Sequence, residues 1–530
     1  MKAKQPQSFL GGAAILAAAG ITSKLLGAIY RIPLARLIGD EGMGLYGMAY
    51  PLYTMILAIS TAGIPVAISK LVAERLAQGK PAAAKQVFRV ALGTLFALGL
   101  VFSFLLFALA QVMVRQGWLR DARAYWPIVA IAPAILLVAL ISSFRGYFQG
   151  QQDMVPTAVS QVVEQLFRAG TALVLGYLLL SRGIEFAAAG AAFGAVSGAA
   201  GALLVLFFYY RRERPLVAEP SEPQDKRTLL AAIFRLAIPV SMASLVMPIM
   251  QNIDVILVPI RLEVAGYTVP EATALFGQLS QMAATLINLP TIITVALAVS
   301  LVPTISAAAT SGDLALLKRR IKTGLRLAIL VELPAFVGLF ILASPIMDLL
   351  YDLPAAGPTL AALSASCLFL GLHQTTSGIL QGLGRTDIPV KSLALGAVLK
   401  VILTYSLTAV PLLGIRGAAL GTVSTFFLAT LLNSLAINRL VSFSWDVREL
   451  VLKPAAATAI MALVVVIGYR ILLSSLGTSL ATILAIGLGG LGYSSALFLV
   501  RAFSLEDLEL LPGPLRSLAQ RLKPGSLARR

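Results

Sequence analysis

The sequence predicts an all-α integral membrane protein with about fourteen transmembrane helices, and three observations support this fold class. Of its 530 residues, 58% are hydrophobic and only 12% are charged, whereas soluble domains carry about 25% charged residues. Long apolar segments recur along the chain, and two stretches repeat one pattern. We therefore expect two six-helix lobes related by pseudo-two-fold symmetry, followed by two extra C-terminal helices.

The repeat is clearest in two stretches of 24 residues. The first, Arg145 to Arg168, reads RGYFQGQQDMVPTAVSQVVEQLFR, and the second, Ser377 to Lys400, reads SGILQGLGRTDIPVKSLALGAVLK. Each has Gly-x-x-Gln-Gly, a polar turn containing Asp, a Pro that starts the next helix, and a basic residue about three turns further on. GAAFGAVS at 190–197 and GAALGTVS at 417–424 extend the repeat in the same order. An even number of spans in each unit gives both halves one orientation in the membrane.

The predicted domain organisation follows the repeat. The segment RRERPLVAEPSEPQDKR is charged, contains Pro and has no apolar period, which is typical of a connection between halves. We expect an N-lobe at 1–210, a cytoplasmic linker at 211–230, a C-lobe at 231–437, two further spans within 438–501 and a cytoplasmic tail at 502–530.

Fourteen segments are long and apolar enough to span a bilayer, which takes about 20 residues. The first and eighth are too long for simple spans, and Pro33, Pro290 and Pro303 are expected kink sites. The predicted segments are 9–37, 45–69, 90–114, 125–149, 156–181, 187–210, 231–260, 272–308, 323–347, 359–383, 389–413, 416–437, 454–474 and 478–500.

Lys and Arg residues predict the orientation. With the N-terminus inside, the inner loops and tails hold 30 of the 42 Lys and Arg residues, the outer loops hold 8, and 4 lie within spans. Cytoplasmic loops carry such an excess, so we expect both termini in the cytoplasm. The same bias accounts for the net charge of +18 without nucleic acid as a partner.

Catalytic motifs are nearly absent from the sequence, so we do not expect an enzyme or a bound cofactor. His373 is the only histidine, and a lone polar residue within a span is more often a helix-packing group than a catalyst. GLGGLG at 487–492 follows no strand and is interpreted as a helix-packing face. Cys367 is the only cysteine, which excludes an internal disulfide and a cysteine-based metal site. No phosphate-binding loop for ATP is present.

Charged residues within the spans are the candidate functional residues, because charge in lipid is costly and normally faces a cavity or a partner. Lys24, Arg31, Arg168 and Lys400 are the predicted contacts for an anionic headgroup. Glu164, four residues before Arg168, is the predicted ion-pair partner of that arginine. The alternative is a set of buried ion pairs together with side chains that reach the interface.

Three further charged residues lie within the spans or at their ends. Asp254, in the seventh span, could hold a cation or a proton, or pair with a lysine. Arg145 is interpreted as a cytoplasmic anchor rather than a substrate contact. Glu332 lies in the ninth span just before Pro334 and receives no assigned role.

The chain resembles a known family in three stretches. SKLLGAIYRIPLARLIGDEGMGLYGMAYPLY at 23–53, STAGIPVAISKLVAERLAQG at 60–79 and the first repeat are similar to the stage V sporulation protein B and YtgP group. That group belongs, with the MurJ lipid II flippases, to the multidrug/oligosaccharidyl-lipid/polysaccharide (MOP) exporter superfamily. The resemblance implies two six-helix lobes that alternate between inward-open and outward-open states in the bacterial cytoplasmic membrane. It also implies transport of an undecaprenyl-pyrophosphate-linked saccharide, with lipid II as the expected substrate.

The family's site residues match only in part. Lys24 aligns with a cavity arginine through Ser-Lys-Leu-Leu-Gly, against Ser-Arg-Val-Leu-Gly in the family, but residues 276–290 contain no basic residue to match a second one. Asp254 matches an acidic ion-site residue, whereas Lys400 occupies the span in which its acidic partner is expected. The coupling ion, Na⁺ or H⁺, therefore remains open.

The expected partners are the lipid-linked saccharide, membrane lipids and cell-wall synthesis proteins, with the chain acting as a monomer. A pyrophosphate cannot cross about 30 Å of hydrocarbon unaided, and a cationic cavity can replace its hydration. The alternatives are an exporter of another lipid-linked polysaccharide precursor, a drug or cation antiporter, a membrane glycosyltransferase, and a cell-wall assembly scaffold. The basic excess within the spans argues against the antiporter, and the short outer loops argue against the glycosyltransferase.

Overall fold

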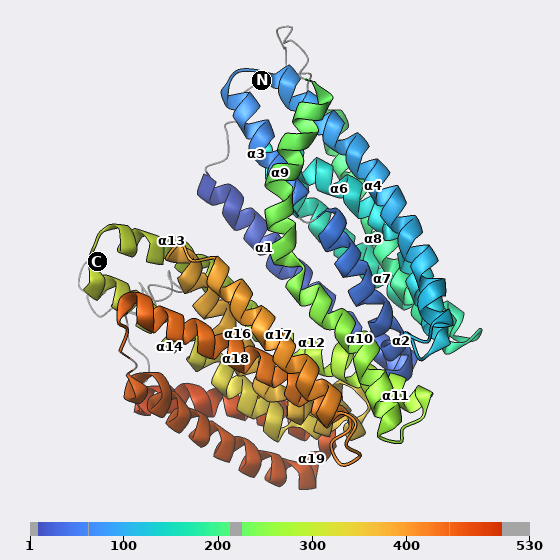
Figure 1. Cartoon of the computed structure of the whole chain (residues 1–530). Helices are drawn as coiled ribbons and strands as arrows, with labels where there is room; N and C mark the ends of the chain where they lie inside the picture. The colour runs from blue at the N-terminus through green and yellow to red at the C-terminus, as the bar shows by residue number, and fades with distance from the viewer. Residues whose placement is uncertain (1–8, 62, 213–224, 445, 501–530) are drawn as a thin grey trace. The chain divides into compact units, whose positions relative to one another are not determined.

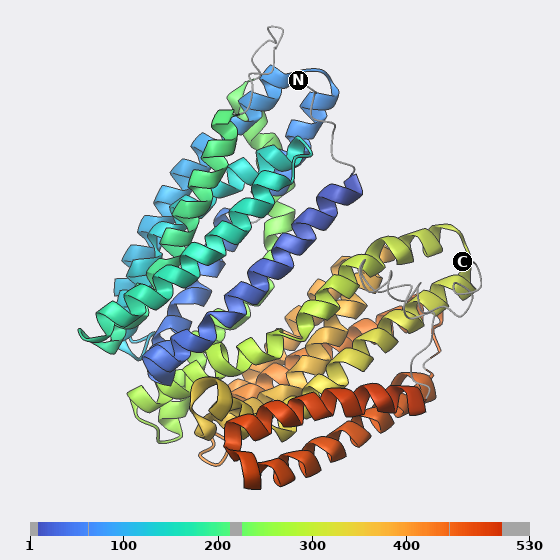
Figure 2. The same ribbon diagram turned by 180° about the vertical axis from the view of Figure 1, so that it is seen from behind.

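The computed structural model describes residues 9–61, 63–212, 225–444 and 446–500, and every regular element in these ranges is a helix (Figures 1 and 2). The predicted all-α fold class is confirmed. Eleven segments of the described chain are long and apolar enough to cross a membrane, and four of these segments, 14–77, 122–150, 354–382 and 448–499, each contain more than one helical element. The number of fourteen spans stays a prediction.

The chain packs into two compact units. Unit 1 holds the described residues up to 263 and residues 267–282, and unit 2 holds 264–266 and the described residues from 283 onward. The predicted domain boundaries rest on the sequence repeat rather than on packing, and they stay predictions. Part of the predicted linker, 213–224, and the predicted tail, 502–530, lie outside the described residues.

Unit 1 is built from eleven α-helices, one 3₁₀ turn and most of one π-helix within its described residues. These elements are α1 (Phe9–Ile29), α2 (Arg31–Ser60), α3 (Ile64–Ala77), α4 (Pro81–Arg115), η1 (Ala122–Ala124), α5 (Tyr125–Ile131), α6 (Pro133–Gly150), α7 (Val155–Leu180), α8 (Ile184–Arg212), α9 (Lys226–Ser244), α10 (Val246–Val264), α11 (Val269–Gly277) and the π-helix η2 (Gln278–Ala283).

The first predicted span is bent, as its length required. α1 gives way to α2 at Tyr30, three residues before Pro33, which lacks the N–H that the carbonyl of Ile29 would accept. Gly39 then breaks the helical path of α2 with φ 69° and ψ −179°. The predicted second span, 45–69, is not one helix, because α2 ends at Ser60 and α3 begins at Ile64, next to Pro65.

Helices α9 to α11, most of which the sequence repeat assigned to the C-lobe, pack within unit 1. The amide Nδ2 of Asn252 on α10 donates to the carbonyl of Pro51 on α2 at 2.8 Å. The hydroxyl of Ser241 on α9 accepts from the backbone N–H of Gly63 at 3.1 Å. A Cβ at Gly44 of α2 would lie 2.0 Å from the carbonyl oxygen of Thr273, so only glycine permits this close approach of α11.

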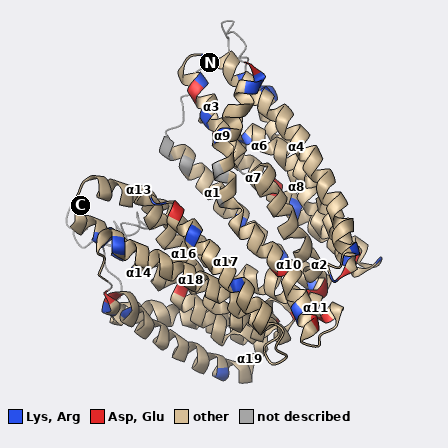
Figure 3. Cartoon of the chain, in the orientation of Figure 1, with Lys and Arg blue, Asp and Glu red and all other residues tan. Residues whose placement is uncertain are grey.

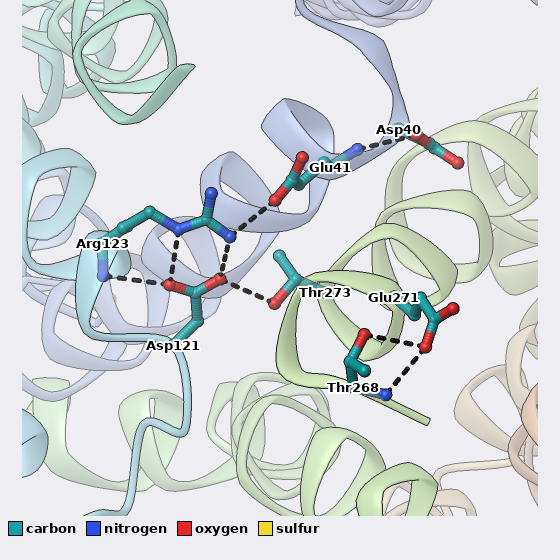
Figure 4. Close-up of polar contacts among 7 residues, drawn as sticks. All are labelled: Asp40, Glu41, Asp121, Arg123, Thr268, Glu271 and Thr273. Atoms are coloured by element: carbon teal, nitrogen blue, oxygen red, sulfur yellow. Dashed lines mark hydrogen bonds and ion pairs between the residues drawn. The ribbon is translucent and has the colours of Figure 1, made fainter. Parts of the chain in front are cut away.

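A polar cluster fastens α11 to α2 and to the 3₁₀ turn η1 (Figure 4). Asp121 is 3% exposed and accepts from Arg123 Nε and Nη2 at 3.0 and 2.8 Å. The hydroxyl of Thr273 donates to the same carboxylate at 2.9 Å, and Arg123 also pairs with Glu41 at 2.6 Å. Because Asp121 has partners on two separate elements, it joins α11 to the rest of unit 1.

Glu271 closes the first turn of α11. Its carboxylate accepts from the backbone N–H and the hydroxyl of Thr268 at 2.8 and 2.7 Å (Figure 4). The backbone hydrogen bond from Thr268, followed by the hydroxyl, lowers the pKa of Glu271 below its usual value. An acidic side chain in the first turn is also favoured by the helix dipole.

The described residues of unit 2, like those of unit 1, form helices joined by short connections. Its helices are α12 (Ala284–Asn288), α13 (Thr291–Thr310), α14 (Leu314–Ile341), α15 (Ala343–Tyr351), α16 (Gly357–Gly382), α17 (Asp387–Leu407), α18 (Ile415–Val441) and α19 (Lys453–Leu499), with short helical turns η3 (Pro354–Ala356) and η4 (Arg448–Leu452). The range of α19 contains a break at Gly477, with φ 73° and ψ 173°, so it comprises two helices.

The repeated stretches form equivalent hairpins, α6–α7 in unit 1 and α16–α17 in unit 2. A Cβ at Gly150 would lie 2.8 Å from the carbonyl oxygen of Ser69 on α3, and a Cβ at Gly382 would lie 2.8 Å from that of Val302 on α13. The Gly-x-x-Gln-Gly motif therefore brings one helix close to another in each unit. Equivalent turn positions, Gln152 and Gly384, have φ values of 60° and 75°.

Two packing interpretations from the sequence are confirmed. His373 of α16 is buried, and its Nδ1 lies 3.4 Å from the amide nitrogen of Asn433 on α18. Gly489, in the GLGGLG stretch, would place a Cβ 2.6 Å from Val465 in the first half of α19. Both groups therefore serve helix contacts.

Candidate functional site

Three helices of unit 1 bring together two arginines, one glutamate and one tyrosine. Glu164 on α7 accepts from Arg168 Nη2 at 2.9 Å and from Arg145 Nη2 on α6 at 3.0 Å. Arg168 Nη1 also donates to the Tyr50 hydroxyl on α2 at 3.2 Å, and Arg145 Nε donates to the Ser160 hydroxyl at 3.1 Å. We call Arg145, Glu164, Arg168 and Tyr50 the arginine cluster.

The local sequence explains why these groups meet. Glu164 and Arg168 are four residues apart on α7 and therefore lie on one face. The short turn after Gly150 joins α6 to α7, and Arg145 near the end of α6 reaches Glu164 on α7 across it. The pair of Glu164 with Arg168 is present as the sequence suggested, while its part in substrate binding stays a prediction.

The cluster is largely buried and carries excess positive charge. The side chains of Arg145, Glu164 and Arg168 are 18%, 12% and 9% exposed. One carboxylate faces two guanidinium groups, and within the described residues Arg168 Nε has no hydrogen-bond partner in the protein. A buried donor without a partner is costly, so the arrangement favours an additional acceptor such as a phosphate oxygen.

Arg31 adds a further positive charge at Tyr50. Its guanidinium carbon lies 5.7 Å from the centre of the Tyr50 ring, a cation–π distance. The hydroxyls of Tyr30 and Tyr46 lie 3.1 Å apart beside this region of α2. Tyr50 thus contacts two of the predicted basic residues, Arg31 with its ring and Arg168 with its hydroxyl.

The remaining predicted residues lie outside this cluster. Lys24 is exposed on α1, a helix that packs against α7. Asp254 is half-buried on α10 of unit 1, although the sequence repeat placed its span in the second half. Lys400 is 5% exposed on α17 of unit 2, so it belongs to a different compact unit from the other five.

A metal site has no ready-made cluster in the described part of the chain. No group of three or more His, Cys, Asp or Glu side chains is close enough there to hold a metal ion. Asp254 as a cation or proton site therefore stays a prediction.

Sequence reasoning missed two members of the arginine cluster. It assigned Arg145 to anchoring and did not consider Tyr50. The spacing of 19 residues between Arg145 and Glu164 across a short turn was a usable signal, since long side chains on two helices joined by such a turn can meet near it. Tyr50 gave no signal of this kind, because its contact with Arg168 spans 118 residues.

A second feature of unit 1 is an apolar hollow of about 710 Å³ on α4, α6 and α8. Apolar side chains and Arg89 line it, and none of the predicted site residues takes part.

The sequence itself matches known families. Residues 9–306 match the family described as polysaccharide biosynthesis protein, and residues 239–406 match the MatE family. Stage V sporulation protein B of Bacillus subtilis (strain 168) is 33% identical over 447 residues, which cover 84% of this chain and 86% of that protein. The chain belongs to the polysaccharide biosynthesis protein family of the MOP superfamily.

Two further relatives agree with this assignment. Lipid II flippase MurJ of the same organism is 28% identical over 459 residues, covering 83% of this chain and 84% of MurJ. A solved structure of lipid II flippase MurJ in an inward closed conformation matches with a TM-score of 0.68 at 16% identity, covering 92% of this chain and 99% of that structure. The predicted resemblance is confirmed, and the chain is a multi-pass membrane transporter rather than an enzyme.

Proposed function

We propose that this family member flips an undecaprenyl-pyrophosphate-linked saccharide across the bacterial cytoplasmic membrane, and that its substrate is lipid II. The observation that carries the proposal is the arginine cluster, in which two buried guanidinium groups share one carboxylate inside membrane-spanning helices. The names of two relatives, a lipid II flippase and a sporulation protein, support a role in cell-wall assembly.

The chemistry of the substrate fits this cluster. A pyrophosphate carries charge that hydrocarbon cannot solvate, so its passage requires replacement of its hydration by fixed donors. Among the described residues Arg168 Nε–H has no protein partner, and Arg31 lies over the ring of Tyr50, whose hydroxyl Arg168 contacts. Lys24 and Lys400 are proposed to contribute further contacts, each from its own helix.

A cation antiporter of the same superfamily is the weaker candidate. It requires excess negative charge where cations bind, whereas the arginine cluster has excess positive charge.

In the proposed mechanism, the undecaprenyl tail remains in lipid during transport, and alternating access exposes the headgroup on the other side. The termini are proposed to be cytoplasmic, with drive from the membrane potential, an ion gradient or removal of product outside.

The proposal is tested with the full chain in proteoliposomes that contain fluorescent lipid II. An external enzyme that modifies only outward-facing headgroups reports flipping. We expect wild-type protein to expose lipid II and the variants Lys24→Ala and Lys400→Ala to do so more slowly. A second substrate arm with a different undecaprenyl-pyrophosphate saccharide separates lipid II from other precursors.

Two results would contradict the proposal. If wild-type protein exposes neither lipid, the proposed flippase function is wrong. If it exposes only the second saccharide, the flippase function holds but lipid II is not the substrate. Complementation of a flippase-depleted cell separates general wall synthesis from a role in sporulation.

A further inference from the structure

A carboxyl group lies fully buried in unit 2, away from the arginine cluster. Glu332 on α14 is 0% exposed, within a helix long and apolar enough to span the membrane (Figure 3 shows the few acidic positions in the described helices). Within the described residues it forms no ion pair. Its two hydrogen-bond partners are neutral: the Thr294 hydroxyl on α13 at 2.9 Å and the Cys367 thiol on α16 at 2.9 Å.

Burial of an ionised carboxylate without a cation is very costly, and such a group is normally neutral or bound to a cation. A hydroxyl and a thiol are weak donors in comparison with a guanidinium or an ammonium group. The surroundings of Glu332 therefore favour its neutral, protonated form.

The hydrogen bonds at Thr294 accommodate a protonated carboxyl. Its Oγ1 lies 2.9 Å from Glu332 Oε1, 3.0 Å from the Thr291 carbonyl and 2.9 Å from Gln374 Oε1. A hydroxyl has one hydrogen and cannot donate to three acceptor oxygens. A proton on Glu332 Oε1 supplies a donor to Thr294, whose own hydrogen is then available to Thr291 or Gln374.

The packing excludes a larger ion between the carboxyl and its hydrogen-bond partner Thr294. A Cβ at Gly371 of α16 would lie 2.4 Å from Glu332 Cγ and 2.6 Å from Oε1, so the backbone of α16 closes one side. The distance of 2.9 Å from Oε1 to Thr294 Oγ1 is that of a direct hydrogen bond. A proton fits this arrangement, and Na⁺ between these two oxygens does not.

The other titratable groups near this position are few. The range 291–310 of α13 contains no charged side chain, and α16 presents Cys367 to the carboxyl while its His373 faces Asn433. On α14 itself, the first basic residue that precedes Glu332 is Arg326, which pairs with Glu449 at 3.6 Å. From α19, the Tyr493 hydroxyl donates to the Leu330 carbonyl at 2.7 Å.

Glu332 also lies where Pro334 interrupts the backbone hydrogen bonds of α14. Pro334 has no N–H, so the carbonyl of Leu330 loses its partner within the helix. Tyr493 supplies the missing donor from α19. Glu332 lies between Leu330 and Pro334 on α14. A bend of α14 at this point would change the contacts of Glu332 with Thr294 and Cys367. Gln374 is half-buried, so hydrogen bonds lead from Glu332 through Thr294 toward a more exposed amide.

We propose that Glu332 is a proton-binding site of unit 2, protonated while α13, α14 and α16 pack as observed and able to release its proton when that packing opens. The bond that forms and breaks is the O–H bond of the carboxyl, and the proton passes to water. Coupling of this proton to transport rests on the proposed flippase function, whereas the protonated state does not.

The protonated state is tested by infrared spectroscopy of the purified full chain at neutral pH. We expect a carbonyl band of a protonated carboxyl that is absent in Glu332→Gln and retained in Asp446→Asn, a control at an exposed ion pair. Cys367→Ser should shift this band, because it changes the donor to Oε2. A wild-type spectrum without the band, or a carboxylate band that responds to Na⁺ instead, would overturn the proposal.

Coupling is tested separately in the lipid II flipping assay. A pH difference across the proteoliposome membrane should change the wild-type rate by up to about tenfold for each pH unit when one proton is coupled. Glu332→Gln should flip without this response. A variant that responds as wild type does would overturn coupling through Glu332. A wild-type protein that flips no lipid would instead contradict the proposed function and leave the infrared result unaffected.

Discussion

The hairpins α6–α7 and α16–α17 share their architecture but differ in charge. In unit 1, Arg145, Glu164 and Arg168 form a bridged cluster. In unit 2, Ser377 occupies the position equivalent to Arg145, and Gly396 occupies that of Glu164, four residues before Lys400. A Cβ at Gly396 would lie 2.6 Å from the Thr425 carbonyl oxygen, so close packing of α17 on α18 excludes a glutamate there. The repeat thus preserves the backbone, whereas the glutamate that bridges two arginines in unit 1 has no counterpart at the equivalent position in unit 2.

The largest expected effect comes from breaking the arginine cluster of unit 1. Glu164→Ala leaves two arginines buried without their carboxylate, and loss of one partner of a buried ion pair costs about 3–5 kcal/mol. Denaturant unfolding in detergent measures the change. The triple variant Arg145→Met, Glu164→Leu, Arg168→Met should recover stability but flip no lipid. A Glu164→Ala protein within about 1 kcal/mol of wild type would show that the cluster is already solvated.

The next effect tests whether the two hairpins pack equivalently. Gly150→Ala and Gly382→Ala each place a Cβ 2.8 Å from a backbone carbonyl oxygen. Overpacking of this kind costs about 1–3 kcal/mol, and the two losses should be similar. Thermal unfolding provides the measurement. Gly487→Ala is the matched control, since nothing lies within 4 Å of its Cβ. A large loss in only one hairpin would separate the two copies.

A smaller effect concerns the turn of each hairpin. Gly384 has φ 75°, so Gly384→Ala should cost about 1–2 kcal/mol, the usual penalty of the left-handed region. Gln152 already has this unfavourable conformation, with φ 60°. Gln152→Gly should therefore stabilise the fold, but by less than Gly384→Ala destabilises it, because glycine loses more backbone entropy on folding. Equal destabilisation by both substitutions would mean that the turns differ in conformation.

The smallest expected effect is at an exposed ion pair of unit 2, which contrasts with the buried cluster of unit 1. The hydrogen bond from Lys322 at 2.7 Å lowers the pKa of Asp446 in the folded chain. This contribution is present above the pKa of the unfolded aspartate and is lost as the pH falls through the lower folded pKa. Asp446→Asn should therefore remove only a slight acid-side dependence of the melting temperature. A large loss of stability at neutral pH would show that the pair is more buried than its 35% and 40% exposure indicates.

The sequence alone was sufficient for the helical class, the repeat and the pair of Glu164 with Arg168, because each depends on local spacing or composition. It did not reveal contacts made across long sequence separations. Tyr50 reaches Arg168, and Cys367 and Thr294 enclose Glu332, only because distant helices pack together. The assembly of α11 with α2 depends on the glycine at position 44 and the buried carboxylate of Asp121, which no periodicity marks.

The central claim is that basic side chains within the membrane-spanning helices, among them Arg168 and Lys400, bind the pyrophosphate of the substrate. The direct measurement is the lipid II flipping rate of Arg168→Gln and Lys400→Gln beside Arg168→Lys and Lys400→Arg, each normalised to folded protein. Loss of one charged hydrogen bond of about 1.5–3 kcal/mol predicts a rate about tenfold to a hundredfold lower in each Gln variant, with a smaller loss when the charge is kept. Folded Gln variants that flip lipid II at the wild-type rate would contradict the account.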